Sequence, residues 1–197
     1  QYRNFYSNGV QGGIVPVAVG MAKAEKIKNS GNIVLCFIGD GTLGEGIVYE
    51  TFNLASLWGA PVLYVLENNH IAQTTPIDLA LAGDLRARFN AFGIPAYELD
   101  SSDVREIVPL AQELITDVRR RSSPAGLILS TCRFGPHSKG DDTRPQEMID
   151  RLRQERDPLT IQAARLRADE RTRIEDDINQ EIQAAFQQAC TDPVPVL

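Results

Sequence analysis

Two short apolar runs, residues 33–38 and 61–66, constrain the fold more than any other feature of the chain. Both are continuous and rich in branched side chains, which is typical of strands buried on both faces of a parallel sheet. A strand–helix–strand unit of this length places the carboxyl ends of both strands at one edge of the sheet. Asp40 follows the first strand and Asn69 follows the second. We therefore expect these two side chains to lie side by side where open α/β sheets bind ligands.

The loop over residues 39–44, Gly-Asp-Gly-Thr-Leu-Gly, opens the helix between the two strands. Glycine lets a ligand approach the backbone closely, and a helix N-terminus offers free N–H groups and partial positive charge suited to a phosphate. The oxygens of Asp40 and Asn69 are hard ligands suited to Mg²⁺ or Ca²⁺. Together they predict a metal–diphosphate site. A plain Asp-Gly turn is the alternative, and the strand and helix contexts favour the site.

The composition of the chain excludes several classes of protein. Its 197 residues suffice for one domain with a full core, and the net charge of −6 comes from interspersed acids and cations, so no basic patch indicates nucleic-acid binding. No apolar run approaches the length of a membrane span, and we expect a cytoplasmic or organelle-matrix protein. The three cysteines form no CxxC motif, and Cys36 and Cys132 lie in apolar runs typical of packed thiols.

The rest of the chain alternates strands and helices, which predicts an α/β fold with a mostly parallel sheet flanked by helices and a C-terminal helical tail. The other predicted elements are a helix over 15–29, a long loop over 70–83, a helix over 84–92, a strand over 96–99, a helix ending near 120, a strand over 125–131, and helices from 146 onward. On the helix after the glycine loop, one face carries Ile47, Thr51, Leu54 and Trp58.

Two further stretches bear on function. Residues 133–144 concentrate glycine, proline, His137, lysine and aspartate at a strand end, on the same sheet edge as Asp40 and Asn69. A functional loop and a flexible surface loop are the two interpretations. The final helix, over 170–190, carries an apolar stripe that packs either against this domain or against a partner. The stripe consists of Ile174, Ile178, Ile182 and Phe186.

These features resemble the alpha subunit of the thiamine diphosphate-dependent 2-oxoacid dehydrogenases, the decarboxylating component of the pyruvate, branched-chain and acetoin dehydrogenase complexes. The resemblance extends from residue 4 to about residue 195. The segments on which it rests are residues 4–6, 9–20, 39–41 with 67–69, 133–144 and 156–158. The last two of these segments set the chain apart from transketolases. It implies the thiamine diphosphate-binding fold, with residues 1–160 as the diphosphate-binding half. Residues 161–197 would be its C-terminal helical extension, and the N-terminal part of the family domain would be missing.

The resemblance also implies a metal and a diphosphate site. Mg²⁺ would be bound by Asp40, Asn69 and the backbone carbonyl of Ile71, with diphosphate oxygens and a water completing six ligands. The diphosphate would lie against the glycine loop, in contact with Gly39, Gly41 and Thr42.

The other end of the cofactor is assigned in the same way. Gly9 and Gln11 would hold the aminopyrimidine through main-chain atoms, although Gln11 departs from the apolar residue usual there. His137 matches the catalytic loop histidine that lies over the cofactor, and Ser138 matches a position phosphorylated in some mitochondrial relatives. The preceding Gly-Pro pair departs from the common His-Gly or His-His pairing.

The resemblance implies that the protein decarboxylates a 2-oxoacid on thiamine diphosphate and transfers the acyl group to a lipoyl carrier. The family glutamate that activates the aminopyrimidine lies on the beta subunit, whereas Glu45 and Glu67 of this chain lie at the diphosphate end. We therefore expect activity only with a beta subunit, in a heterotetramer of two alpha and two beta chains that works with a lipoyl acyltransferase component. The alternatives are the diphosphate-binding half of a split transketolase-like enzyme and a non-catalytic cofactor-binding or assembly subunit.

Overall fold

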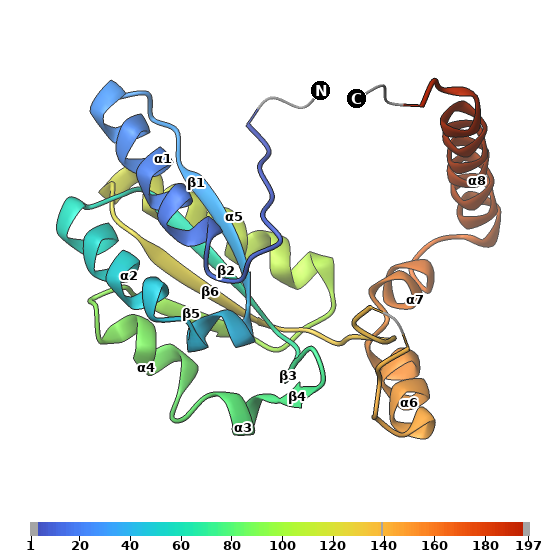
Figure 1. Cartoon of the computed structure of the whole chain (residues 1–197). Coiled ribbons are helices and arrows are strands. Elements are labelled where there is room, and N and C mark those ends of the chain that lie inside the picture. The colour runs from blue at the N-terminus through green and yellow to red at the C-terminus, as the bar shows by residue number, and fades with distance from the viewer. Residues whose placement is uncertain (1–3, 139, 195–197) are drawn as a thin grey trace. The chain divides into compact units, whose positions relative to one another are not determined.

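The structure is a computed structural model that describes residues 4–138 and 140–194. The chain divides into two compact units, Gln1–Asp157 and Pro158–Leu197. The first unit contains a four-stranded parallel sheet flanked by helices, and the second is helical (Figure 1). This architecture confirms the predicted α/β fold with a C-terminal helical part.

The central sheet has the strand order β1 (Val34–Gly39), β2 (Val62–Asn68), β6 (Ala125–Ser130) and β5 (Ala96–Leu99), and all neighbouring strands are parallel. A helix lies in the connection between successive strands of this sheet, as parallel pairing requires. All the carboxyl ends therefore meet at one edge, which is the edge predicted to carry the site.

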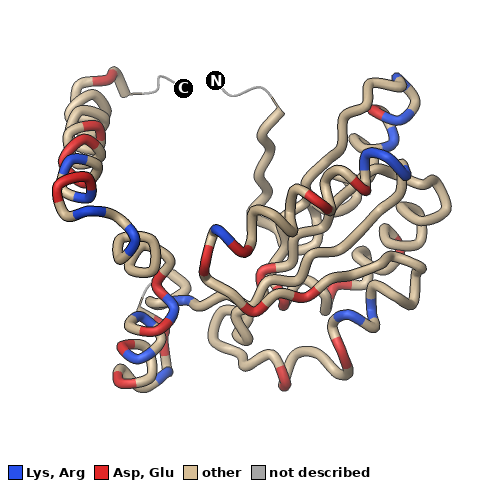
Figure 2. The backbone as a smooth tube through the Cα atoms, turned by 180° about the vertical axis from the view of Figure 1, so that it is seen from behind, with Lys and Arg blue, Asp and Glu red and all other residues tan. Residues whose placement is uncertain are grey.

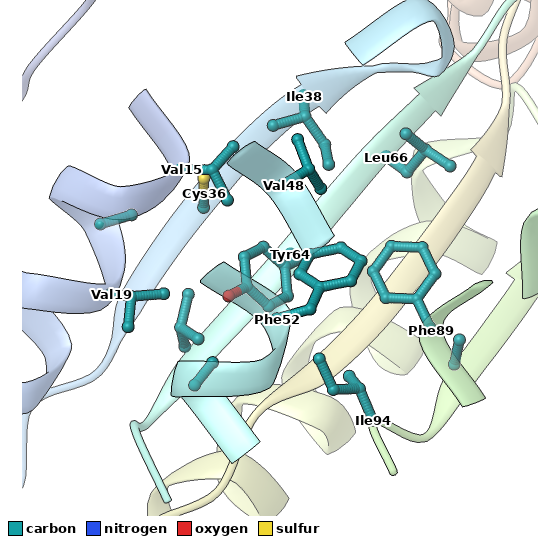
Figure 3. Packing of buried hydrophobic residues seen from close by; sticks show 14 of the residues in the cluster. Val15, Val19, Cys36, Ile38, Val48, Phe52, Tyr64, Leu66, Phe89 and Ile94 are labelled. Atoms are coloured by element: carbon teal, nitrogen blue, oxygen red, sulfur yellow. The ribbon is translucent and has the colours of Figure 1, made fainter. Parts of the chain in front are cut away.

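Helices cover both faces of the sheet around β2. On one face α1 (Ile14–Lys28), α2 (Gly46–Trp58) and α4 (Leu85–Asn90) enclose the larger core cluster. The ring of Phe52 lies at the centre of this cluster, with its centroid 4.8 Å from those of both Tyr64 and Phe89 (Figure 3). On the other face Leu114 and Val118 of α5 (Val104–Arg121) pack in a cluster that also contains Leu63.

The prediction that both apolar runs are buried on both faces holds for β2 and is wrong for β1. Residues 62–66 of β2 are all buried, because side chains alternate between the two helical layers. In β1 only Cys36 and Ile38 are buried, whereas Leu35 and Phe37 are 43% and 61% exposed. The reason is topological, since β1 lies at the edge of the four-stranded sheet and only its face toward α1 is covered.

The face of α2 that sequence spacing singled out is not the face that the fold buries. Of its four residues only Thr51 is buried, whereas Ile47, Leu54 and Trp58 are exposed. Intervals of three and four place either set on one side of a helix, so spacing alone cannot select a face, and packing against the larger core cluster selects the residues that are buried. They are Val48, Thr51, Phe52 and Ala55.

The predicted loop over 70–83 contains secondary structure that periodicity could not reveal. It holds a hairpin of β3 (Ile71–Ala72) and β4 (Thr75–Pro76), followed by the short helix α3 (Ile77–Ala80). Elements of two to four residues carry no measurable period.

The remaining elements are the 3₁₀ helix η1 (Asp40–Gly44) and the helices α6 (Gln146–Arg156), α7 (Pro158–Ala163) and α8 (Ala168–Thr191).

Charge and burial agree with the composition. Figure 2 shows cations and acids interspersed along the described backbone. The predicted packed thiol at Cys36 is confirmed, since it is a free, buried cysteine and burial raises the pKa of its thiol to about 12. Within residues 4–138 and 140–194, no helix is both long and apolar enough to cross a membrane.

Candidate functional site

The register of the sheet brings the two predicted metal ligands to the ends of adjacent strands. Gly39 of β1 pairs with Glu67 of β2. Asp40 leaves β1 directly after this pair, and Asn69 leaves β2 two residues after it. The 3₁₀ helix η1 that begins at Asp40 packs against β2 and β3.

The carboxylate of Asp40 is buried and only half satisfied. Its side chain is 3% exposed, and Oδ1 accepts the Gly41 N–H at 2.7 Å. Oδ2 is buried with no hydrogen-bond partner in the structure. An unpaired buried carboxylate oxygen is costly unless a cation or a donor meets it. A divalent cation fits here, because it would neutralise the buried carboxylate and bind the oxygen that has no hydrogen-bond partner.

Asn69 and Ile71 belong to one turn. Asn69 Oδ1 accepts the Ile71 N–H at 3.1 Å, and Asn68 Oδ1 accepts the His70 N–H at 3.3 Å. His70 has a left-handed backbone with φ of 62°. These bonds fix the orientation of both asparagines. A second lone pair of Asn69 Oδ1 remains for a cation.

Cation ligands in this region would be few and mostly neutral. Among the described residues, no group of three or more His, Cys, Asp and Glu side chains is placed to hold a metal ion. A cation bound here would therefore depend on Asp40, on neutral oxygens such as that of Asn69, and on oxygens of a ligand. This set suits Mg²⁺ bound together with a diphosphate, because Mg²⁺ usually takes few protein carboxylates and completes its shell with phosphate and water oxygens.

The glycine loop is held on two further sides. Thr42 is buried, and its hydroxyl donates to Gln11 Oε1 at 2.5 Å. A Cβ on Gly41 would come within 2.7 Å of the Ala72 Cβ, so only glycine fits beneath the β3–β4 hairpin. Gln11, where the resemblance leads us to expect an apolar residue, thus supplies a side-chain contact to η1 that sequence patterns did not reveal.

Gly9 lies in the turn that leads to Gln11. The Asn8 side chain accepts the Val10 N–H at 2.9 Å across this turn. Gly12, one residue beyond Gln11, is buried with φ of +75°, and a Cβ there would lie 3.1 Å from side-chain atoms of Glu45 and Ile47. Gly12 therefore lies against the start of α2, while Gln11 contacts η1.

The loop over residues 133–144 is held by a compact ionic network. Arg144 binds Asp142 with both Nε at 2.9 Å and Nη2 at 2.7 Å, and the two side chains are only 12% and 11% exposed. The guanidinium of Arg144 lowers the pKa of the Asp142 carboxyl to about 2. The Gly135 carbonyl accepts from both Arg133 Nε and Arg144 Nη2. His137 is exposed within this loop.

Contacts connect this loop to the glycine loop. Arg133 Nη1 donates to the Gln73 carbonyl at 2.9 Å, and Asp141 accepts from the Gln73 side chain. Gln73 follows Ala72, which packs against Gly41. The His137 loop and the Asp40 loop are thus joined through the β3–β4 hairpin.

The end of α6 attaches the far side of the His137 loop to the sheet edge. Arg156 Nη2 donates to the Ser130 carbonyl at 3.0 Å, at the end of β6. Its Nη1 forms an ion pair with Asp100 at 2.7 Å, beyond the end of β5. These contacts give Arg156, one of the residues that carries the resemblance, a structural role.

Comparison with known proteins decides the family. Residues 2–197 match the model of the family described as dehydrogenase E1 component.

This chain belongs to the dehydrogenase E1 component family.

Relatives in this E1 family include proteins named pyruvate dehydrogenase E1 component subunit alpha. The protein from Rhizobium meliloti is 36% identical over 90% of this chain and 52% of its own length. The protein from Zymomonas mobilis is 34% identical over 99% of this chain and 57% of its own length. A testis-specific mitochondrial form from Rattus norvegicus is 30% identical over 99% and 52%, respectively. This chain therefore spans about half the length of the curated relatives it matches.

Family membership confirms the resemblance read from the motifs. Sequence patterns in this E1 chain did not reveal Gln73 and Ala72, which connect the two loops, or the Asp142–Arg144 pair, which holds the His137 loop together. The spacing of Asp142 and Arg144 within a glycine-containing loop was the available signal for the pair. The role of Ala72 depends on an approach between distant backbones, which no local pattern indicates.

Proposed function

We propose that this chain is the alpha subunit of a 2-oxoacid dehydrogenase, which decarboxylates a 2-oxoacid on thiamine diphosphate and passes the acyl group to a lipoyl carrier. Membership of the E1 family supports the proposal. The observation that carries it is the unpartnered Oδ2 of buried Asp40, at the carboxyl edge of a parallel sheet and beside a glycine loop that opens a helix. A metal–diphosphate group would satisfy that oxygen and use that helix end.

Each predicted site residue has a proposed task at the diphosphate end. Asp40, Asn69 and the Ile71 carbonyl would hold Mg²⁺, with Asp40 as its one anionic protein ligand. The diphosphate would take the N–H groups of Gly41 and Thr42 beside Gly39. The Gly41 N–H now bonds to Asp40 Oδ1, so that bond would be exchanged on binding. Main-chain atoms of Gly9 and Gln11 would hold the aminopyrimidine.

Thiamine diphosphate, when bound, supplies the nucleophilic carbon and the electron sink that protein side chains lack. The chain's task is to anchor and orient the cofactor and to manage protons around it. We assign the proton task to His137, since an imidazole can act as a general acid or base. The other histidine in the sequence, His70, lies in the turn fixed by Asn68.

A partner is part of the proposal, because activating the aminopyrimidine needs a carboxylic acid at its ring nitrogen. Glu45 is the N-cap residue of α2 and Glu67 lies at the end of β2, so both belong to the diphosphate end. We propose that a beta subunit supplies the acid in a heterotetramer of two alpha and two beta chains, with a lipoyl acyltransferase as acyl acceptor. Residues 1–160 would form the diphosphate half of the cofactor domain and 161–197 its helical extension. A cytoplasmic or organelle-matrix location fits this assembly.

The test is an assay of the full-length protein with its beta chain, thiamine diphosphate and Mg²⁺. Reduction of an artificial electron acceptor with pyruvate or a branched 2-oxoacid is the expected result. Turnover of ketose phosphates instead would favour a transketolase-like enzyme. Cofactor binding without turnover of either substrate class would favour a non-catalytic subunit.

A further inference from the structure

Two side chains from separate helices meet at the end of the glycine loop. The Leu43 carbonyl of η1 accepts the hydroxyl of Tyr49, which lies in α2, and Nη1 of Arg88, which lies in α4, at 3.3 Å. Arg88 Nη1 also donates to the Tyr49 hydroxyl oxygen, and its Nη2 donates to the Ala82 carbonyl. One guanidinium thus connects η1, α2 and the segment before α4.

The Leu43 carbonyl lies near the end of η1, where it has no hydrogen-bond donor within the helix itself. The last carbonyls of a helix have no intrahelical donor, and a cation there suits the helix dipole. Tyr49 and Arg88 together fill both lone pairs of the Leu43 oxygen. The carbonyl is therefore fixed in direction by two donors from outside η1.

The two donors are themselves held rigidly. The Tyr49 ring stacks on Phe92 with centroids 6.0 Å apart and meets Phe52 edge-on at 6.4 Å. The Arg88 guanidinium lies 5.7 Å from the centroid of the Tyr49 ring. Because the core positions the ring, the donors need no ordering when a ligand binds at η1.

We propose that Arg88 and Tyr49 are positioning residues for the diphosphate loop. They act through the Leu43 carbonyl to hold η1 in its binding conformation, and neither is assigned a contact with the cofactor. This inference rests on the proposed function, since it takes η1 as the diphosphate loop. Loss of the two donors would leave the end of η1 free to move, two residues after Gly41. Binding would then include the cost of ordering the loop.

The test measures ligand affinity in the full-length protein with its beta chain, with Mg²⁺ present, by calorimetry. Mg²⁺-pyrophosphate probes the loop alone, and thiamine diphosphate probes the whole cofactor. Arg88→Met and Tyr49→Phe should each raise both Kd values about tenfold, the effect of losing one or two hydrogen bonds to a fixed carbonyl. Arg86→Met removes the same charge from an exposed position of α4, and its Kd should stay within about twofold of wild type.

A purely structural role for Arg88 and Tyr49 predicts a lowered melting temperature in the variants, with no change in ligand affinity. Positioning should raise the KM for thiamine diphosphate while leaving kcat at saturating cofactor unchanged. Unchanged Kd values in both variants, with a lowered melting temperature, would overturn the inference and leave the proposed function standing. If Arg88→Met does not fold, Tyr49→Phe decides alone, because it keeps the packed ring and removes only the hydroxyl. Wild-type protein that binds neither probe would overturn the proposed function and this inference together.

Discussion

Gly41 lies directly against Ala72, so closely that a Cβ on Gly41 would come within 2.7 Å of the Ala72 Cβ. This contact joins the glycine loop after β1 to the hairpin after β2. It sets how far the backbone of η1 stands from the turn that carries Asn69. The arrangement of both loops of the proposed site therefore requires glycine at position 41 and a small side chain at position 72.

Gly41→Ala should destabilise the protein by about 1–3 kcal/mol, because the added methyl forces η1 and the hairpin apart. Urea unfolding measures the free energy. Gly46→Ala is the matched control, since a Cβ there meets no atom within 4 Å, and its unfolding free energy should change by less than about 0.5 kcal/mol. Equal effects of the two substitutions would contradict the tight approach.

Asp40→Asn should separate stability from binding. Without cofactor the variant should be at least as stable as wild type, because it removes a buried carboxylate whose Oδ2 has no partner. Affinity for thiamine diphosphate with Mg²⁺ should fall by about 100-fold or more, since the proposed metal site would lose its one charged protein ligand. Urea unfolding and calorimetric titration give the two quantities.

Two further variants serve as comparisons for Asp40→Asn. Asn69→Ala should weaken cofactor binding less than Asp40→Asn, because it removes a neutral oxygen. Asp78→Asn, at an exposed position of α3, should change neither quantity. Undiminished affinity in Asp40→Asn would remove Asp40 from the metal site.

Tyr64→Phe should stabilise the protein or leave its stability unchanged. The Tyr64 side chain is fully buried, its hydroxyl has no partner in the structure, and burial raises its pKa. Replacing it keeps the ring packed on Phe52 and removes an unsatisfied group worth about 1 kcal/mol. Urea unfolding measures the change. A clear loss of stability would mean that the hydroxyl has a buried water as its partner.

The Asp142–Arg144 pair should give the protein an acid-dependent contribution to stability. The folded pKa of Asp142 is about 2, below the ordinary value near 3.8. A carboxyl with a lowered folded pKa stabilises the protein above its unfolded pKa and loses that effect as pH falls through the folded one. The stability difference between wild type and Asp142→Asn should thus be constant above about pH 4 and largely gone near pH 2. Chemical denaturation across this range measures it, and a pH-independent difference would contradict the ion pair.

The purified full-length chain, with thiamine diphosphate and Mg²⁺ but no beta chain, should release no CO₂ from any 2-oxoacid. The physical reason is that in the proposed site residues of this chain would hold the diphosphate end, whereas the aminopyrimidine would need an acid from elsewhere. Addition of the beta chain should start turnover. Steady CO₂ release by the chain alone would show that the site is complete without a partner.

Local patterns were sufficient for much of the fold and for the candidate ligands. The apolar run of β2 indicated a strand buried on both faces, and residues 62–66 are all buried. The glycine loop after β1 and the asparagines after β2 indicated a shared edge, because a parallel unit has one arrangement of its strand ends. Asp40 and Asn69 could be named on these grounds before any coordinates.

Position within the sheet could not be predicted in the same way. The runs of β1 and β2 look alike, yet Phe37 is 61% exposed, because an edge strand and a central strand differ only in their neighbours. The buried face of α2 was missed for a similar reason. A largely apolar helix has several plausible faces, and the contact with Tyr64 and Phe89 selects one.

The sequence by itself thus determined the chain order of the four sheet strands and the longer helices, the family, and the chemical groups at the strand ends, since these depend on neighbours along the chain. Tertiary structure decided what holds those groups in place. The contacts that do so join separate elements: Ala72 packs against Gly41, Gln11 accepts from Thr42, and Arg88 and Tyr49 donate to the Leu43 carbonyl. Such contacts exist only once the chain has folded, because they depend on distances between backbones that are far apart in sequence.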